Sequence, residues 1–499
     1  MSGDILDRAL AAKAVITIVA ALLLSGCQQE GGAQIAPIAP TPVAESLEQV
    51  TTKALDAMGM AGVGRIEYTA DGWEACLGQP WNIDDGWARW AITDYSRVID
   101  YDTFNSVQTA QRQAGMDPDK LGGCGAQPGA AVQTQRSSVN VSSPWLQQLQ
   151  VHLTPPGFLK LAGSVNAAVM RGDGGLQLAM DVDSGGITYH LVGSYGDDYL
   201  LDHVLTRVDD SVFGDMAFEA EFNDYRNFNG VVFPGHIVQK QGGFATLDLV
   251  VNSVDPATTT SAEPPEGSGR FGGGQQPDLP PYERLGEGIY ALHGAYQSVV
   301  MGFADFTVVL DGLQNDARAD EIIALAKELF PAKPIGYVLT THNHFDHASG
   351  LRQFVAEGAT ILTHDTNVDF FAEALANPRT LNPDAIDTSG LPVDILGVGD
   401  FLAIDDGTQR VEFHKLSGST HADDALIAFI PAIQTIVEAD LLQPWINPVF
   451  GGGDHPFLVW LAGELDRLGI DYAQFVPVHR PASPPLMIKA ELMDAVGRN

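Results

Sequence analysis

Apolar positions in the second part of the chain follow two alternating patterns. Short, mostly apolar runs bounded by turn residues predict strands, and these runs cover residues 288–292, 307–310, 335–340, 359–363, 411–416, 425–430, 435–438 and 475–478. Longer stretches with apolar residues three or four positions apart predict helices at 317–330, 349–357 and 455–468. Strands and helices that alternate in this way indicate a layered α/β domain.

Residues 187–254 show a different pattern, in which polar and apolar positions alternate over short runs. The runs begin with Ile187–Tyr195 and end with Ala245–Val254, and turn residues such as Asn229-Gly230 separate them. A period of two with such turns predicts an antiparallel meander with one buried face. The stretch also resembles the half-barrel of lipoprotein carriers, a curved sheet with an apolar concave face.

The segment before this meander, 64–115, is rich in tryptophan. It holds Trp73, Trp81, Trp87 and Trp90. Aromatic side chains at this density fill a core or line a ligand groove. The sequence leaves both possibilities open.

Segments rich in proline, glycine and small residues divide the chain, because they cannot pack a core. They are residues 28–45, which we interpret as a tether, and residues 257–281, which we interpret as a linker between domains. The predicted organisation is a signal peptide at 1–27, the tether, a β-rich domain at 46–256, the linker and an α/β domain at 282–499.

The N-terminus has the features of an export signal. Arg8 and Lys13 precede the apolar run Ala14–Leu24, which is shorter than the roughly 20 residues that span a bilayer. The sequence Leu-Ser-Gly-Cys that ends at Cys27 resembles a bacterial lipoprotein signal. The resemblance implies a lipid anchor on Cys27 and a periplasmic protein attached to the outer membrane; the alternative is a plain signal peptide.

The two other cysteines, Cys76 and Cys124, lie in the predicted β-rich domain. An oxidising periplasm permits a disulfide between them. The sequence does not show whether their Cα atoms come close enough to pair.

The charge of the chain is strongly negative. There are 63 acidic and 27 basic residues, a formal net charge of −36. Such a surface repels phosphate backbones, so we do not expect the protein to bind nucleic acid. We expect a small-molecule substrate, and the sequence gives no sign of a protein partner.

Four side chains that can bind a metal stand close together in the stretch Thr341–Gly350. They are His342, His344, Asp346 and His347, directly after a predicted strand. Alternate residues of an extended stretch point the same way, so His342 and His344 can bind one ion while the other two turn toward a second. Imidazole and carboxylate groups suit zinc, iron or manganese.

This motif resembles the signature of the metallo-β-lactamase superfamily. The resemblance implies a four-layer αββα fold and identifies His421, Asp440 and His479 as the remaining ligands. His342, His344 and His421 would hold the first metal; Asp346, His347 and His479 the second; and Asp440 would bridge both. Around His479 the chain departs from the family, with Val478 and Arg480 in place of glycines.

The resemblance further implies two zinc ions, with iron or manganese as alternatives. A hydroxide shared by the metals would attack the substrate, and Asp346 would orient it and accept its proton. The resemblance also implies that Asp440 at the bridging position favours the thioesterase, lactonase and phosphodiesterase branches over true β-lactamases. We expect cleavage of an ester, lactone, thioester or amide. Four residues are candidates for the substrate pocket: Trp445, Phe450, His455 and Arg480.

Two other functions remain possible from the sequence. Iron in place of zinc would indicate an oxidoreductase of the same superfamily, because its ligands suit both metals. A lipoprotein that binds a lipid in the half-barrel without catalysis is the second alternative. The complete set of metal ligands favours the enzyme.

Overall fold

The computed structural model describes residues 45–114, 123, 132–172, 175–264, 279–442, 456–479 and 486–498. The predicted signal peptide with Cys27 and all of the tether except Glu45 lie outside these residues, as does the middle of the predicted linker. The export signal, the lipid anchor and the domain boundaries therefore stay predictions. Among the helices that the structure describes, none is long and apolar enough to cross a bilayer.

The first part of the chain forms one eleven-stranded antiparallel sheet in the order β4-β3-β2-β1-β13-β12-β9-β8-β7-β6-β5. Its strands are β1 (Arg65–Cys76), β2 (Ala88–Asp100), β3 (Asn105–Ala114), β4 (Gln133–Val139), β5 (Ala168–Gly172), β6 (Gly175–Ser184), β7 (Ile187–Tyr195), β8 (Leu201–Asp210), β9 (Gly214–Asn223), β12 (His236–Gln241) and β13 (Phe244–Asp255). A separate hairpin joins β10 (Arg226–Phe228) to β11 (Val231–Phe233). The predicted antiparallel sheet is confirmed, and it is larger than the meander alone because β1 pairs with β13.

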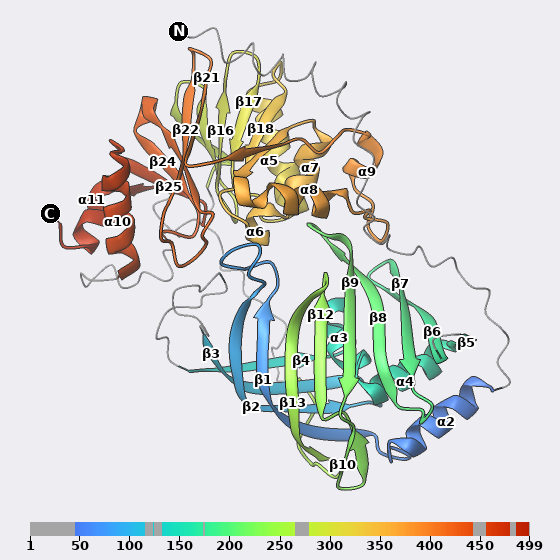
Figure 1. The fold of residues 1–499 in the computed structure, drawn as a ribbon. Helices are drawn as coiled ribbons and strands as arrows, with labels where there is room; N and C mark the ends of the chain where they lie inside the picture. Colours follow the sequence, from blue (N-terminus) through green and yellow to red (C-terminus); the bar gives the residue numbers. More distant parts are fainter. Residues whose placement is uncertain are drawn as a thin grey trace, which may run out of the picture. The chain divides into compact units, whose positions relative to one another are not determined.

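The sheet curves around helices α3 (Trp145–His152) and α4 (Pro155–Val165), as Figure 1 shows. A third helix, α2 (Leu47–Ala57), begins at the N-cap Ser46. Phe158 of α4 packs onto Gly193 of β7, where a Cβ atom would come within 2.4 Å of the phenyl ring. The concave face is therefore covered by helices over this part of the sheet.

The tryptophans have different environments. Trp87 and Trp90 are buried and help to fill the core. Trp73 is half-buried with the guanidinium group of Arg89 over its ring. Trp81 donates a hydrogen bond from its indole nitrogen to the carbonyl oxygen of Ser419, which lies in the α/β domain.

The second part of the chain contains two sheets. The first has the order β14-β15-β16-β17-β18-β19-β20 and the second runs from β21 to β26 in sequence order. The strands of the first sheet are β14 (Tyr282–Gly286), β15 (Ile289–Leu292), β16 (Ser298–Gly302), β17 (Thr307–Leu310), β18 (Ile335–Leu339), β19 (Thr360–His364) and β20 (Ile395–Val398). Those of the second are β21 (Phe401–Asp405), β22 (Arg410–Lys415), β23 (Leu426–Ile430), β24 (Thr435–Glu438), β25 (Gln474–Pro477) and β26 (Met487–Ile488).

Helices flank the sheets on both outer sides. Those beside the first sheet are α5 (Asp316–Leu329), α6 (Phe345–Ala348), α7 (Leu351–Ala356), α8 (Val368–Ala376) and α9 (Ala385–Ser389). The second sheet packs against α10 (Pro456–Leu468) and α11 (Lys489–Ala495). Buried side chains such as Val299, Leu310 and Phe413 fill the space between the sheets. This is the four-layer αββα arrangement, and the expected fold class is confirmed.

The structure differs from the expected elements around the metal motif. The helix predicted at 349–357 is present as α7, and the residues just before it form an additional short helix, α6, that the sequence pattern did not predict. This additional helix begins at Phe345 and carries Asp346 and His347. Asp346 and His347 therefore lie on a helix, whereas His342 lies in the non-helical stretch before it.

Candidate metal centre

The seven predicted ligands meet at one edge of the two sheets, where several strands end. His342 and His344 follow β18, and Asp346 and His347 lie on α6. The remaining three, His421, Asp440 and His479, lie in the β22–β23 connection, after β24 and after β25. Ligands that are 137 positions apart in the chain are thus brought together by the layered fold.

One set of side chains consists of His342, His344, His421 and Asp440, whose ligand atoms all lie within 4.8 Å of one another. The Nε2 atom of His342 is 2.9 Å from Nδ1 of His344 and 3.3 Å from Nε2 of His421. These nitrogen atoms face a common point. The set matches the first metal site that the resemblance implied.

The second set consists of Asp346, His347, Asp440 and His479, with the same spread of ligand atoms. Nε2 of His347 lies 3.2 Å from Nε2 of His479 and 3.5 Å from Oδ2 of Asp346. His479 therefore joins the set despite the missing glycines beside it. This set matches the second implied metal site.

Asp440 belongs to both sets. Its Oδ2 atom is 3.2 Å from Nε2 of His342 and of His421 and 3.0 Å from Nε2 of His347, while Oδ1 is 2.8 Å from Nε2 of His479. Its backbone has a φ of +63°, a left-handed conformation that residues other than glycine rarely adopt. Such strain persists where the surrounding structure enforces it, and it is common at functional sites.

Asp311, at the end of β17, supports the site from behind. Its Oδ1 atom is 2.9 Å from Nδ1 of His347, and it also accepts hydrogen bonds from the backbone and hydroxyl of Thr341. Burial opposes its ionisation, but the charge of His347 and these hydrogen bonds outweigh that effect and hold the pKa of Asp311 below its ordinary value. The bond to Nδ1 leaves Nε2 of His347 free to bind a metal.

Sequence reasoning did not identify Asp311 or Tyr296 as site residues. The hydroxyl group of Tyr296 donates a hydrogen bond of 2.7 Å to Oδ2 of Asp346. Asp311 had a signal that was overlooked, since it directly follows a predicted strand, as Asp440 does. For Tyr296, between β15 and β16, the sequence pattern gave no comparable signal.

The residues fit a metal centre. Asp311 and Asp440 are buried, with Asp346 half-buried beside them, and burying ionised carboxylates is costly unless positive charge accompanies them. Burial raises the pKa of Asp440, but the neighbouring His479 and His421 outweigh it and hold that pKa well below its ordinary value. Imidazole and carboxylate donors in two sets that share one aspartate suit a pair of divalent ions.

The four candidate pocket residues, Trp445, Phe450, His455 and Arg480, lie outside the described residues, so their role stays a prediction. Cys76 is disulfide-bonded. Its predicted partner, Cys124, also lies outside the described residues, and that pairing is not tested.

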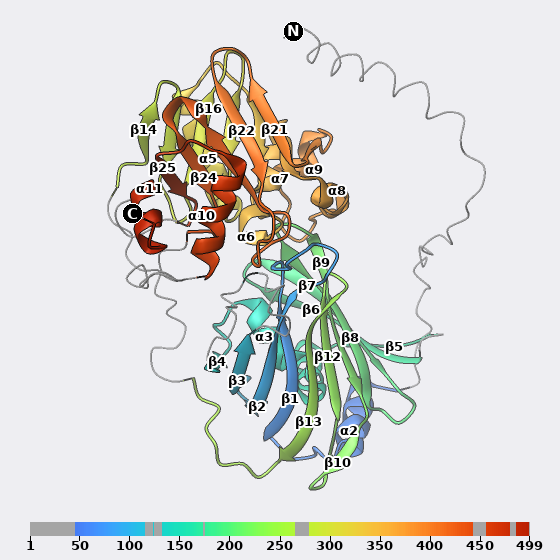
Figure 2. The same ribbon diagram turned by 60° about the vertical axis from the view of Figure 1, so that its left-hand side comes forward.

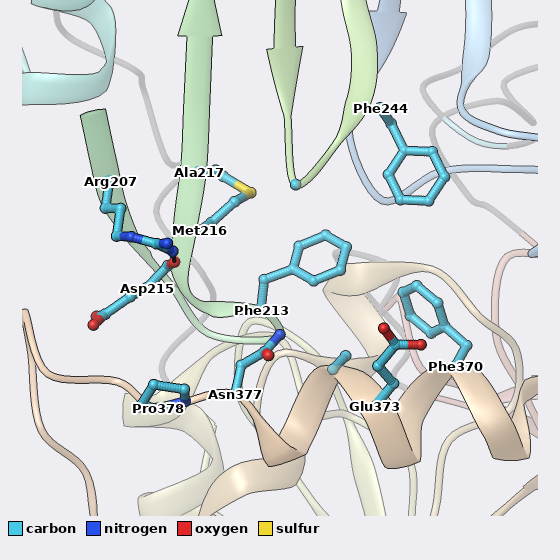
Figure 3. Close-up of a pocket in the computed structure, with 12 residues that line it drawn as sticks. Arg207, Phe213, Asp215, Met216, Ala217, Phe244, Phe370, Glu373, Asn377 and Pro378 are labelled. Atoms are coloured by element: carbon cyan, nitrogen blue, oxygen red, sulfur yellow. Dashed lines mark hydrogen bonds between the residues drawn. The ribbon is translucent and has the colours of Figure 1, made fainter. Parts of the chain in front are cut away.

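A cavity of about 610 Å³ lies near the metal ligands but is not formed by them. Figure 3 shows Phe213, Phe244 and Phe370 along its wall, with Asp215 and Glu373 among the polar residues. Both Phe213 and Phe370 contact Phe345, with ring centroids 5.4 and 6.3 Å apart. Phe345 stands between His344 and Asp346 in the sequence, so it connects this cavity to the metal motif.

Two stacked sheets between helices, with clustered histidines and aspartates at one edge, define a metal-binding protein of the αββα class. Residues 294–422 match the family model of the metallo-beta-lactamase superfamily. Within the α/β part of the chain, this segment carries the sequence pattern of that superfamily.

A curated relative is the 2,4-dinitroanisole O-demethylase subunit alpha of Nocardioides sp. (strain JS1661). It is 21% identical over 189 residues, which cover 37% of this chain and 53% of the relative. The chain therefore spans about half the length of this relative.

Solved structures with some likeness include metallo-beta-lactamases from Pontibacter korlensis and Hirschia baltica. The first is 14% identical with a TM-score of 0.32, over 44% of this chain and 97% of the other. The second is 17% identical with a TM-score of 0.31, over 44% and 96%. Rubredoxin oxygen:oxidoreductase from Desulfovibrio gigas is 11% identical with a TM-score of 0.31, over 43% and 61%.

Proposed function

We propose that this protein is a hydrolase that holds two zinc ions and cleaves an ester, lactone, thioester or amide bond. The observation that carries the proposal is the position of Asp440, whose carboxylate lies within 3.2 Å of histidines from both ligand sets. Three protein ligands beside a shared aspartate leave room for water and substrate, which is typical of catalytic metal sites.

Two bound divalent ions would lower the pKa of water toward neutrality and polarise the carbonyl oxygen of the substrate. Asp346 is the residue that we assign to orient the attacking water and accept its proton. Burial opposes its ionisation, but the charge of His347 outweighs that effect and keeps the pKa of Asp346 below its ordinary value. Burial and the nearby Asp346 raise the pKa of Tyr296, so its phenol stays protonated and donates to Oδ2 of Asp346.

This chemistry decides which substrates an activity assay should compare. They are an ester, a lactone, a thioester and an amide, each in a neutral and a negatively charged form. The name of the curated relative adds an aryl methyl ether. Because the chain carries a net charge of −36, we expect neutral substrates to be preferred over anionic ones.

The test is metal analysis of the whole protein and of Asp440→Asn. Asparagine tolerates the left-handed backbone at this position better than alanine does, so this variant removes the charge with little added strain. We expect about two zinc ions per chain in the wild type, about one or fewer in the variant, and a fall in hydrolysis of about 100-fold or more.

His364→Gln is the control, because His364 is a buried histidine of the same domain that belongs to neither set. It should keep its zinc and its activity. Iron in place of zinc in the purified protein would favour the iron-dependent oxidoreductase instead. Absence of bound metal from the wild type would refute the hydrolase.

A further inference from the structure

The loop between β1 and β2, residues 77–87, reaches the metal motif from the β-rich domain. Figures 1 and 2 both show it extending toward α6. The backbone nitrogen of Phe345 donates a hydrogen bond of 2.9 Å to the carbonyl oxygen of Gly78. Gly78 has a φ of +70°, and a Cβ atom there would lie 2.2 Å from the ring of Phe345. Only glycine allows this close approach.

The next residue of the loop, Gln79, binds a metal ligand directly. Its Nε2 atom donates a hydrogen bond of 2.6 Å to Oδ1 of Asp346. The other oxygen, Oδ2, is the one that accepts from Tyr296 and lies 3.5 and 3.6 Å from Nε2 of His347 and His479. Gln79 thus holds Oδ1 aside and leaves Oδ2 directed at the second ligand set.

Gln79 is itself held in place. Its backbone nitrogen donates to the carbonyl oxygen of Cys76, and its carbonyl oxygen accepts from the backbone nitrogen of Gly123. A Cβ atom at Gly123 would lie 1.5 Å from Oε1 of Gln79, so the side chain is closely enclosed. An enclosed side chain fixes its partner more firmly than a free one does.

Pro80 acts on a second ligand through its backbone. Its carbonyl oxygen lies 3.0 Å from Nε2 of His344. A carbonyl oxygen only accepts, so Nε2 must carry the proton and Nδ1 is left with its lone pair. Nδ1 is the atom that lies 2.9 Å from Nε2 of His342, on the side of the first ligand set.

The far end of the loop holds the segment that carries His421. The indole nitrogen of Trp81 donates a hydrogen bond of 2.8 Å to the carbonyl oxygen of Ser419. The backbone nitrogen of Asp423 donates one of 2.7 Å to the carbonyl oxygen of Trp81. Asn82 adds a longer bond from Nδ2 to Oδ2 of Asp423. The loop therefore contacts both segments that supply the first ligand set's histidines.

We propose that this loop is part of the metal centre, with Gln79 and the Pro80 carbonyl as positioning groups that fix Asp346 and His344. The inference rests on the proposed function in so far as it requires a metal at the two sets. The inference goes beyond the proposed function because it assigns the orientation of two ligands to residues of the β-rich domain. Groups that orient metal ligands typically change metal affinity by 10- to 100-fold when they are removed.

The test uses the full chain with Gln79→Met, which has a similar length but no donor. Zinc affinity is measured by competition with a chelator, and the visible absorption of the cobalt(II)-loaded protein reports the ligand geometry. We expect zinc to bind about 10-fold or more weakly and the cobalt spectrum to shift. Gln79→Glu, which places a carboxylate against Asp346, should change both readouts in the same direction.

Gln177→Met is the matched control, because Gln177 is a half-buried glutamine of the same sheet whose Nε2 donates to Oγ of Ser194 and contacts no residue of either ligand set. It should leave the zinc affinity within about twofold and the cobalt spectrum unchanged. Melting curves of the metal-free proteins establish that each variant folds. If the wild type binds two zinc ions and both Gln79 variants keep its affinity and spectrum, the inference is wrong while the hydrolase stands. A wild type that binds no metal overturns both.

Discussion

At the scale of single residues, His152 is a buried histidine that resists protonation. It lies in α3 with the rings of Phe104 and Trp145 at centroid distances of 4.7 and 5.5 Å. Burial lowers the pKa of His152 to about 4. In the unfolded chain a histidine takes up its proton near pH 6.5, so the stability that this residue contributes is complete above that pH and is lost as the pH falls toward 4.

We therefore expect the wild type to lose about 2 kcal/mol more unfolding free energy than His152→Phe between pH 7 and pH 5. Urea denaturation at the two pH values measures the difference. His190→Phe is the control, since His190 is an exposed histidine of β7 in the same β-rich part of the chain, and it should follow the wild type. Parallel pH profiles for the wild type and His152→Phe would contradict the assignment.

At the scale of elements, Arg379 connects three elements that lie far apart in the sequence, α8, β8 and α5. It follows α8 and binds Asp209 of β8 through two nitrogens, at 2.6 and 3.1 Å, and Asp316 of α5 at 2.6 Å. Its side chain is 3% exposed. Removing one partner of a buried ion pair leaves uncompensated charge, which is more costly than losing an exposed pair.

Arg379→Met should lower the unfolding free energy by about 3 kcal/mol, because Asp209 and Asp316 lose their cation. Arg410→Met is the matched control. Arg410 pairs with Asp405 and Glu412, but its side chain is 42% exposed, so its loss should cost less than about 1 kcal/mol. If denaturation curves showed the same loss of unfolding free energy in both variants, the buried ion pairs would contribute no more to stability than the exposed ones.

At the scale of the whole molecule, the net charge of −36 sets the response to salt. Like charges repel one another in the compact state, and salt screens this repulsion over about 10 Å at 0.1 M. We expect the melting temperature to rise from about 50 mM to about 1 M sodium chloride. Sucrose at the same osmolality separates screening from general exclusion effects. A melting temperature that falls with salt would mean that attractive ion pairs outweigh the repulsion.

The sequence predicted the parts of the site that are local. His342 to His347 stand within six positions of one another, and their order after a strand places them at a sheet edge. The sequence could not predict Gln79, which is 267 positions from its partner Asp346 and shares no motif with it. The short helix α6 was not predicted, because the histidines and Asp346 of the motif show no helical spacing of apolar residues.

The contacts of the β1–β2 loop have a consequence for how this protein can change over evolution or in the laboratory. The two halves of the chain look exchangeable, because a proline- and glycine-rich stretch separates them in the sequence. Yet a chimera that took its first half from another protein would inherit a different environment for Asp346 and His344. The metal preference of the centre would then depend on the β-rich domain, although that domain supplies none of the candidate ligands.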